Sequence, residues 1–434
     1  MRTLLPILVL LASAGMARAQ GTAAHLTAEQ AVALALENNH GVRMARNSAE
    51  MAKSANSAGS AGMLPTLDAN GGYSMDNAGT EQAFFTGEVR ETDNANAQAL
   101  NAQVELNWTL FDGLSMFAAK DRLETLERIG EGQLRQTMEA TVYGVLANYF
   151  QLVQLEKAVA VQRESLQTSR ERLLITGTGE RAGTASGLDL VQAQLDLSTD
   201  SAQLLALLQQ TATARAALNT LLARPPATPL EVDTLIPAGE PLDLPTLQQA
   251  ALSANTALQL AREEHLAADL SVKELRGTLL PKLDGFANYG WSRTTSDVGF
   301  LMSNQRLGPQ YGLTLSVPLF RGGAIKAVKQ AQLYGAQLGL AEDQARLELD
   351  RDLLDVWNQY GYAAQRVQLE EANLAGARTQ MQVALESYRI GVITAVQLRD
   401  VQQGLVTAEN RLLTARFEAK VAELQLRLLA GKLL

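Results

Sequence analysis

The chain has 434 residues, a formal net charge of −9 at pH 7 and no cysteine. An acidic chain without a block of lysines and arginines is a poor match for nucleic acid or for anionic lipid surfaces. The lack of cysteine excludes disulfides, thiolate metal sites and a lipid-modified N-terminal cysteine.

The first 19 residues have the pattern of a secretory signal peptide. Arg2 gives a positive start, the residues that follow are largely apolar, and Ala17-Arg18-Ala19 is a small-x-small cleavage site. The apolar stretch is too short to cross a bilayer as a helix, so a membrane anchor is the weaker interpretation. Cleavage after Ala19 would remove Arg2 and Arg18 and change the net charge from −9 to −11. The sequence therefore predicts export.

Four short segments recur later in the chain in the same order, which indicates an internal duplication. The offset between the copies is 216 residues for the first two segments, then 209, then 208. A shorter loop in the second half explains this change. The matched pairs are 44–46 with 260–262, 64–68 with 280–284, 104–113 with 313–322, and 181–183 with 389–391.

The predicted junction between the two copies is rich in proline. Six of the eleven prolines fall within residues 225–245, and proline disfavours regular helix and favours an extended linker. We therefore expect a signal peptide over 1–19, a first structural repeat over 20–224, a linker over 225–245 and a second repeat over 246–434. Each repeat is predicted to run helix, strand, loop, strand, long helix, turn and helix.

Alternation of apolar and polar residues predicts the strands. Residues 103–111 place Val104, Leu106, Trp108 and Leu110 on one face, and residues 311–319 repeat the pattern with Tyr311, Leu313, Leu315, Val317 and Leu319. The preceding strand, around 283–291, shows a weaker version. One apolar and one polar face suits either a soluble sheet or a barrel wall.

Long helices are predicted after each pair of strands. Gly113 and Gly183 are 70 residues apart, and Gly322 and Gly391 are 69 apart, so at ~1.5 Å per residue each interval is a helix roughly 100 Å long. The return helix over 398–429 is about half as long, and its apolar residues at steps of three and four are typical of a coiled coil.

One chain is not sufficient for this architecture. The short helices expected over 28–59 and 247–275 would stack end to end with the return helices and give four antiparallel columns without a globular core. Four strands cannot close a barrel, and an open strand edge is not tolerated in lipid. A trimer would supply twelve strands, an acceptable closed number. The predicted fold is mainly α, a long antiparallel α-helical coiled-coil barrel plus a small transmembrane β-barrel part of four strands per chain.

The duplicated motifs resemble those of the TolC-like outer membrane efflux protein family, over nearly the whole mature chain from residue 26. The resemblance rests on the paired Leu-Pro strand starts, the Leu-Phe-x-Gly strand ends (110–113 and 319–322) and the two turn motifs over 181–189 and 388–398. No single motif is specific, but the duplicated set in order is. The resemblance implies a homotrimeric channel in the outer membrane of a Gram-negative bacterium, extending into the periplasm and surrounded by outer-membrane lipid.

The resemblance also implies the function and the partners. The chain would be the passive exit duct of a tripartite efflux pump for drugs, toxic compounds or metal ions. It would dock with a periplasmic adaptor (membrane fusion) protein and an inner-membrane transporter of the RND, ABC or MFS type. A channel for type I protein secretion is the alternative, and an exported periplasmic coiled-coil structural protein is a lower one, because it would leave the strands unexplained.

The family resemblance assigns the two turns between the long and return helices to adaptor docking. Helix-terminating glycine is the plainer interpretation of Gly183 and Gly391, and it is compatible with docking. The expected docking residues are Arg181, Gly183, Thr184, Ser186, Arg389, Gly391, Val392 and Thr394.

A periplasmic gate is expected, by the same resemblance, at Asp189, Tyr388, Gln397 and Asp400. A threefold ring of Asp400 would gather three carboxylates and attract cations; a solvated helix carboxylate is the equal alternative. Gln397 and Ile393 stand where the family pattern can have an aspartate and an arginine, which counts against a salt-bridged lock.

Four aromatic residues on the predicted strands are candidates for a membrane-interface belt, although strand packing explains them nearly as well. They are Trp108, Tyr289, Trp291 and Tyr311. No catalytic, cofactor or metal site is expected, because the three histidines (His25, His40 and His265) lack a metal-binding spacing and neither a phosphate loop nor a nucleophile elbow occurs.

Overall fold

The computed structural model describes residues 24–237, 239 and 241–434, so the predicted signal peptide over 1–19 lies outside the described part. The chain forms two compact units. The tip unit comprises the described residues within Met1–Asn39, Val142–Glu240 and Tyr360–Glu423, and the sheet unit comprises His40–Thr141, Pro241–Gln359 and Leu424–Leu434. Each unit contains segments from both predicted repeats, so the compact units are not the repeats, and the division into repeats stays a prediction.

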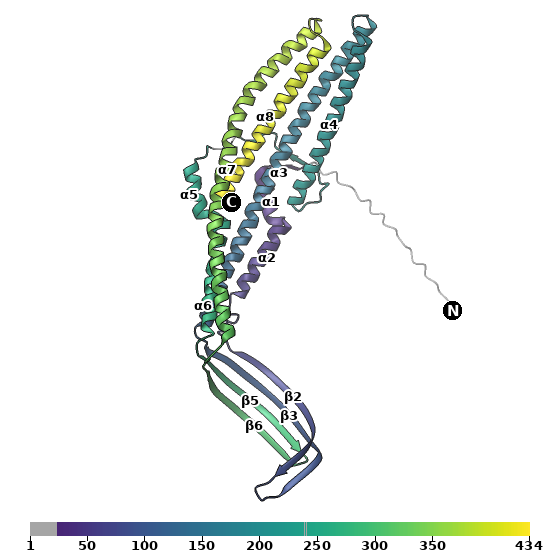
Figure 1. The fold of residues 1–434 in the computed structure, drawn as a ribbon. Helices are drawn as coiled ribbons and strands as arrows, with labels where there is room; N and C mark the ends of the chain where they lie inside the picture. Colours follow the sequence, from purple (N-terminus) through teal and green to yellow (C-terminus); the bar gives the residue numbers. More distant parts are fainter. Residues whose placement is uncertain (1–23, 238, 240) are drawn as a thin grey trace, which may run out of the picture. The chain divides into compact units, whose positions relative to one another are not determined.

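The helices confirm the expected pattern of one long helix, a turn and a return helix in each half of the chain. The long helices α3 and α7 have 67 and 68 residues, and the return helices α4 and α8 have 35 each. In the tip unit α3 lies beside α4, and α7 beside α8 (Figure 1). The bounds are α1 Ala28–Asn38, α2 His40–Ala55, α3 Ser115–Arg181, α4 Gly187–Leu221, α5 Leu244–Ala254, α6 Thr256–Gly277, α7 Gly322–Arg389 and α8 Ala395–Leu429.

The short helices differ from the prediction, because each is broken in two. The helix expected over 28–59 is interrupted at Asn39, and the helix expected over 247–275 at Asn255. Both asparagines leave the helical region, with ψ near 127° and 120°. Asparagine favours such helix ends because its short amide side chain can bond to nearby backbone.

The two asparagines at these breaks make the same long-range contact. The Asn39 side-chain amide donates to the carbonyl of Leu221 at 2.8 Å, and that of Asn255 donates to the carbonyl of Leu429 at 3.0 Å. Each contact satisfies a carbonyl at the end of a return helix, where no intrahelical donor remains. The donors are 216 residues apart and the acceptors 208, which are offsets seen between the repeated motifs.

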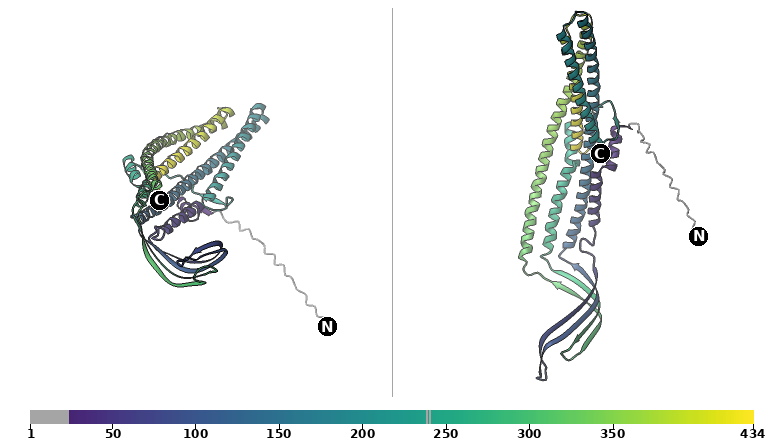
Figure 2. Two further views of the ribbon diagram at one scale, coloured as in Figure 1. Left: turned by 60° about the horizontal axis from the view of Figure 1, so that its bottom comes forward. Right: turned by 90° about the vertical axis from the view of Figure 1, so that its right-hand side faces the viewer.

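Four antiparallel strands make one curved sheet in the order β2-β3-β5-β6 (Figures 1 and 2). They are β2 Thr66–Ala83, β3 Val89–Phe111, β5 Lys282–Ser296 and β6 Ser303–Ser316. The second hairpin is shorter than the first, as the smaller offset between the later repeated segments predicts.

The strands differ from the sequence prediction at two places. Residues 103–111 are only the end of β3, and the strand expected over 311–319 stops at Ser316. Pro318 explains the early end of β6, because proline has no N–H for a sheet ladder.

The strand register gives the sheet one apolar and one polar face. Ala69, Val104, Tyr289 and Pro309 lie in one register row across the four strands. Because side chains alternate along a strand, this row fixes the members of each face. The apolar face carries Leu67, Tyr73, Met75, Leu100, Val104, Leu106, Trp108, Leu110, Leu283, Trp291, Leu307, Tyr311, Leu313 and Leu315. The other face is polar apart from Phe286 and small residues, with Asp68, Asn70, Asn101, Gln103, Glu105, Asn107, Asp284, Asn288, Gln310 and Thr314.

A second, two-stranded sheet was not expected from the sequence. The short strands β1 Ala24–Leu26 and β4 Leu230–Val232 pair in parallel within the tip unit. The buried Tyr149 of α3 fixes them, since its hydroxyl donates to Leu26 O or the Asp233 carboxylate and accepts from Asp233 N. Burial raises the pKa of Tyr149, so the hydroxyl stays protonated.

Among the described residues, none of the helices has the length and apolar character to cross a membrane.

Replacing Asn255 by alanine should destabilise the sheet unit. The substitution removes the Asn255 cap on the Leu258 amide, at about 1 kcal/mol, and leaves the Leu429 carbonyl without its donor, at about 1–3 kcal/mol. Thermal unfolding of the purified protein should show a clear drop in Tm. The control Asn373→Ala removes only an exposed side-chain bond; equal Tm values for the two variants would contradict this role of Asn255.

Candidate functional site

The two turns that join the long helices to the return helices have the same backbone geometry. Gly183 and Gly391 both have φ of +75°, in the left-handed region that glycine adopts at low cost. Residues at matching positions make matching bonds: Thr184 N donates to Gly179 O at 2.7 Å, and Val392 N donates to Ser387 O at 2.8 Å. This pattern is a Schellman ending, which satisfies carbonyls at the end of each long helix.

Reciprocal capping boxes start the two return helices. The Ser186 hydroxyl accepts from Asp189 N at 3.1 Å while Ser186 N donates to the Asp189 carboxylate at 3.0 Å. Thr394 and Gln397 repeat the arrangement, with bonds of 3.3 and 2.9 Å. The bond from the Ser186 hydroxyl lowers the pKa of Asp189. Two of the four expected gate residues, Asp189 and Gln397, therefore act locally by closing their own turns.

The outer surface of the turns mixes cations with exposed apolar side chains. Arg181 and Arg389 end the two long helices and are exposed. Thr184, Ser186, Val392 and Thr394 are exposed as well. Beside them, four large apolar side chains lie mostly in solvent: Leu188, Ile390, Val392 and Val396, at 75, 75, 71 and 63% exposure. Of these four, only Val392 was expected from the sequence as a docking residue.

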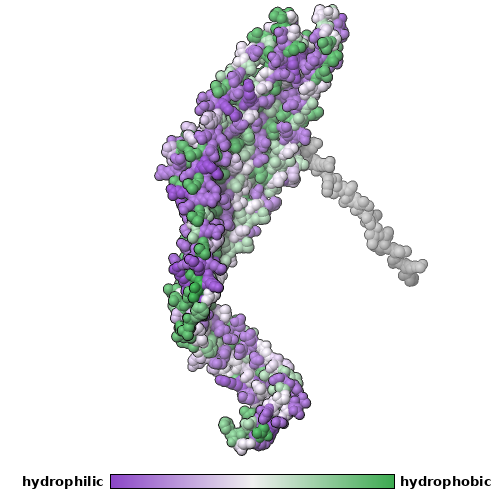
Figure 3. Space-filling view, viewed as in Figure 1, coloured by the Kyte–Doolittle hydropathy of each residue, from purple (hydrophilic) through white to green (hydrophobic). Residues whose placement is uncertain are grey.

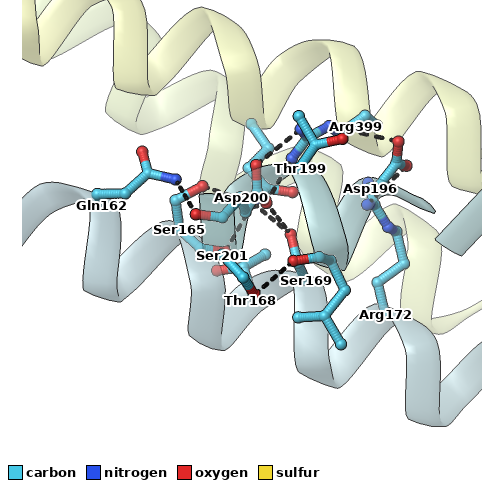
Figure 4. Close-up of polar contacts among 12 residues, drawn as sticks. Gln162, Ser165, Thr168, Ser169, Arg172, Asp196, Thr199, Asp200, Ser201 and Arg399 are labelled. Atoms are coloured by element: carbon cyan, nitrogen blue, oxygen red, sulfur yellow. Dashed lines mark hydrogen bonds and ion pairs between the residues drawn. The ribbon is translucent and has the colours of Figure 1, made fainter. Parts of the chain in front are cut away.

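Behind the turns, a buried network of charged side chains connects α3, α4 and α8 (Figure 4). Asp200 of α4 is 5% exposed and receives two bonds from the Arg399 guanidinium of α8, at 2.7 and 2.8 Å. The Ser169 hydroxyl of α3 donates to the same carboxylate. A two-pronged arginine–carboxylate pair is both strong and directional, so it fixes the position of α8 against α4.

A second ion pair in this network lies between α3 and α4. Arg172 is 1% exposed and donates to Asp196 at 2.8 Å. Burial lowers the pKa of Arg172, and its Nε and Nη1 have no hydrogen-bond partner within the described part of the chain. Gln402 of α8 completes the network by donating to Ser165 O at 2.8 Å. We name the four charged residues Arg172, Asp196, Asp200 and Arg399 the interlock.

The expected gate residues are only partly brought together. The Tyr388 hydroxyl of α7 lies 3.1 Å from the Thr176 hydroxyl, one helical turn from Arg172 on α3. Asp400 is exposed and makes no hydrogen bond or ion pair with any described residue. The interlock itself was missed by sequence reasoning, although the pair Asp196 and Asp200, four residues apart on an otherwise alanine- and leucine-rich helix, was an available signal.

The four strand aromatics all lie on the apolar face of the sheet. Trp108 is at the end of β3 that leads into α3, and its indole N–H donates to Met63 O at 2.9 Å. Trp291 pairs in register with Ala102, which precedes Trp108 by six residues on β3. Tyr289 and Tyr311 fall in rows between them. The apolar face of β3 extends from Leu100 to Leu110, which is 11 residues, and a transmembrane strand needs about 9–11.

Comparison with known proteins identifies a family and several relatives. The family model described as outer membrane efflux protein matches residues 31–224 and 247–432. The alkaline protease secretion protein AprF of Pseudomonas aeruginosa is 25% identical over 92% of this chain and 83% of the relative. The pyoverdine export outer membrane protein OpmQ of Pseudomonas putida is 25% identical over 91% of this chain and 84% of the relative.

Solved structures show the same fold at lower identity. The CmeC outer membrane channel of Campylobacter jejuni has a TM-score of 0.80 and 16% identity, covering 94% of this chain and 86% of that one. The outer membrane protein VceC of Vibrio cholerae has a TM-score of 0.76 and 15% identity, covering 93% and 96%.

Removing the charge of Arg399 should weaken the contact of α8 with α4 behind the turns. Arg399→Gln leaves the buried Asp200 carboxylate without its charged partner, a change that typically costs about 3–5 kcal/mol. Arg411→Gln, the control, breaks an ion pair in which the arginine is half exposed and should cost about 0–1 kcal/mol. Amide exchange should accelerate in the first turns of α8 only in Arg399→Gln. Unchanged exchange there would show that the interlock does not hold α8.

Proposed function

The chain belongs to the outer membrane efflux protein family and is an outer-membrane channel protein, and on this premise we propose that it is the passive exit duct of a tripartite efflux pump. In this proposal, small molecules such as drugs, toxic compounds or metal ions leave through a trimer of this chain. A periplasmic adaptor and an inner-membrane transporter of the RND, ABC or MFS type supply the cargo and the energy. The observation that carries the proposal is the two-faced sheet.

The sheet suits a channel wall that lipid covers on one side and water on the other. Its apolar face is long enough on β3, at 11 residues, to cross the hydrocarbon layer, and its polar face carries amides, hydroxyls and carboxylates suited to an aqueous lumen. In the part of the chain that the structure describes, the outer strands β2 and β6 each have one unpaired edge. Because lipid offers no hydrogen bonds, these edges need strands from other copies, and three copies would close a barrel of twelve.

We further propose that the two turns dock the adaptor. Their exposed apolar side chains, Leu188, Ile390, Val392 and Val396, need a partner to leave water. Arg181 and Arg389, exposed beside them, favour a partner that presents carboxylates at the rim. The Schellman endings and capping boxes hold these side chains in a fixed backbone frame, which reduces the entropy lost on docking.

The four expected gate residues have different surroundings, which suggest different roles. Asp189 and Gln397 support the turns, Tyr388 contacts α3 through Thr176, and an Asp400 ring remains the candidate for a cation-attracting constriction in the trimer. The interlock would act as the resting clamp: movement of α8 away from α3 and α4 has to break the Arg399–Asp200 pair. Docking of the adaptor at the adjacent turns is the event proposed to release it.

Type I protein secretion is the second candidate function. A specific relative favours it, since the chain matches an alkaline protease secretion protein over 92% of its length. Deletion of this chain should raise the accumulation of toxic small molecules if efflux is its task. Loss of a secreted protein from the culture medium, with unchanged drug accumulation, would favour secretion instead.

Replacing Gly391 by valine should impair transport while leaving assembly intact. A β-branched residue at φ of +75° is strained by about 1–3 kcal/mol, so the turn would distort and the docking side chains would move. The control Gly376→Val lies on an exposed part of α7 with ordinary φ and no atom near its Cβ position. Ethidium accumulation in a deletion strain complemented with each variant measures transport, and native mass spectrometry measures assembly. Normal export by Gly391→Val would exclude the turn as a docking site.

A further inference from the structure

The turns of the two β-hairpins carry large apolar side chains that the sheet does not bury. Phe85, between β2 and β3, and Phe300, Leu301 and Met302, between β5 and β6, are 115, 94, 62 and 87% exposed. We name these four residues the turn patch. They lie at the end of the sheet opposite its junctions with the helices, where Figure 3 shows a strongly hydrophobic surface.

Polar strand residues separate the turn patch from the apolar face of the sheet. On β2 the last apolar residue of that face is Met75, ten residues before Phe85, a separation of up to ~33 Å along an extended strand. In the second hairpin, residues 303–306 (SNQR) lie between Met302 and Leu307. If the turn patch lay in hydrocarbon, these polar stretches would lie there too, and burying polar groups without partners is costly. The lipid hydrocarbon is therefore not what covers the turn patch.

The two turns are brought close together within one chain. Residues 89–95 of β3 pair with β2 alone, so the first hairpin is the longer one, and a register shift occurs between Ala78 and Thr80. The side-chain amide of Gln82 lies 3.8 Å from the Cβ position of Gly299. In addition, Asp297 N donates to Asn96 O at 3.1 Å. The longer hairpin therefore reaches the turn of the shorter one at Gln82 and Gly299.

The positions of the edge strands indicate that a second copy of the chain covers the turn patch. Phe85 follows Ala83, the last residue of the edge strand β2, after one intervening residue. Met302 directly precedes Ser303, the first residue of the other edge strand β6. When β2 of one copy pairs with β6 of the next, Phe85 is brought towards the neighbour's copy of residues 300–302. This inference rests on the assembly given under the proposed function.

We propose that the turn patches of adjacent copies pack against one another and form an apolar collar at the outer mouth of the channel. The sequence SNQR and its polar counterparts on β2 and β3 keep this collar above the lipid. A narrow ring of phenylalanine, leucine and methionine disfavours a continuous water column. It restrains ions and polar solutes at rest, while its side chains change rotamer to let a cargo pass.

Cysteine cross-linking tests the collar directly, because the natural chain has no cysteine. Two differently tagged chains, one with Phe85→Cys and one with Met302→Cys, are co-expressed and oxidised in intact cells. Any disulfide between the two tags must join separate copies. The matched control pairs Met302→Cys with Asp68→Cys, which lies on β2 near its junction with the helices. We expect covalent pairs that carry both tags in the first combination, and only background in the control.

Native mass spectrometry of the same samples separates the two proposals. Intact trimers without covalent pairs above the control would overturn the collar and leave the exit duct standing. Absence of trimers would overturn the collar and also the assembly on which it rests. As a second measurement, Phe85→Ser combined with Met302→Ser should preserve the trimer and raise the single-channel conductance in planar bilayers; unchanged conductance would show that the collar does not narrow the mouth.

Discussion

The unpaired backbone edges of β2 and β6 constrain everything else in this molecule. Four strands with one apolar and one polar face, in the order β2-β3-β5-β6, form a curved wall rather than a closed one. A protein of the outer membrane cannot leave rows of N–H and C=O groups facing lipid. In the proposed assembly, partner copies complete the sheet, and the closed, two-faced sheet encloses a channel. The long helices α3 and α7 follow β3 and β6 in the chain, so the same proposed assembly also brings the helices of the copies together.

The helical part depends on a few local devices that occur twice, once in each half of the chain. Schellman endings at Gly183 and Gly391, capping boxes at Ser186 and Thr394, and asparagine bridges to Leu221 and Leu429 satisfy backbone groups at helix ends. The interlock differs from these devices, because it joins Arg172, Asp196 and Asp200 of the first half to Arg399 of the second. It ties the first turns of α8 to the α3–α4 pair through buried charges, where the loss of one partner is costly. The proposed docking surface therefore has two similar turns, with one clamp between α8 and the α3–α4 pair behind them.

Much of the fold was predictable from sequence, because its signals are local. The spacing of the glycines predicts the lengths of α3 and α7, and the alternation of apolar and polar residues predicts the strands at the ends of β3 and β6. The breaks at Asn39 and Asn255 were missed because the carbonyls that these side chains bind are about 180 residues away. The full length of β2 and β3 was missed because their polar outer parts lack alternation. The interlock was missed for a similar reason: Asp200 and Arg399 are 199 residues apart, and only the packing of α4 against α8 makes them partners.

Amide hydrogen exchange of the purified protein in detergent measures whether partner strands cover the outer edges of β2 and β6. Among the described strands, β2 and β6 each have one neighbour, and in the proposed assembly partner strands from other copies protect their second side. With partner strands in place, we expect amides in residues 66–75 and 307–316 to exchange as slowly as those of the central strands β3 and β5. Rapid exchange of the outward-pointing amides of both edge strands would contradict it.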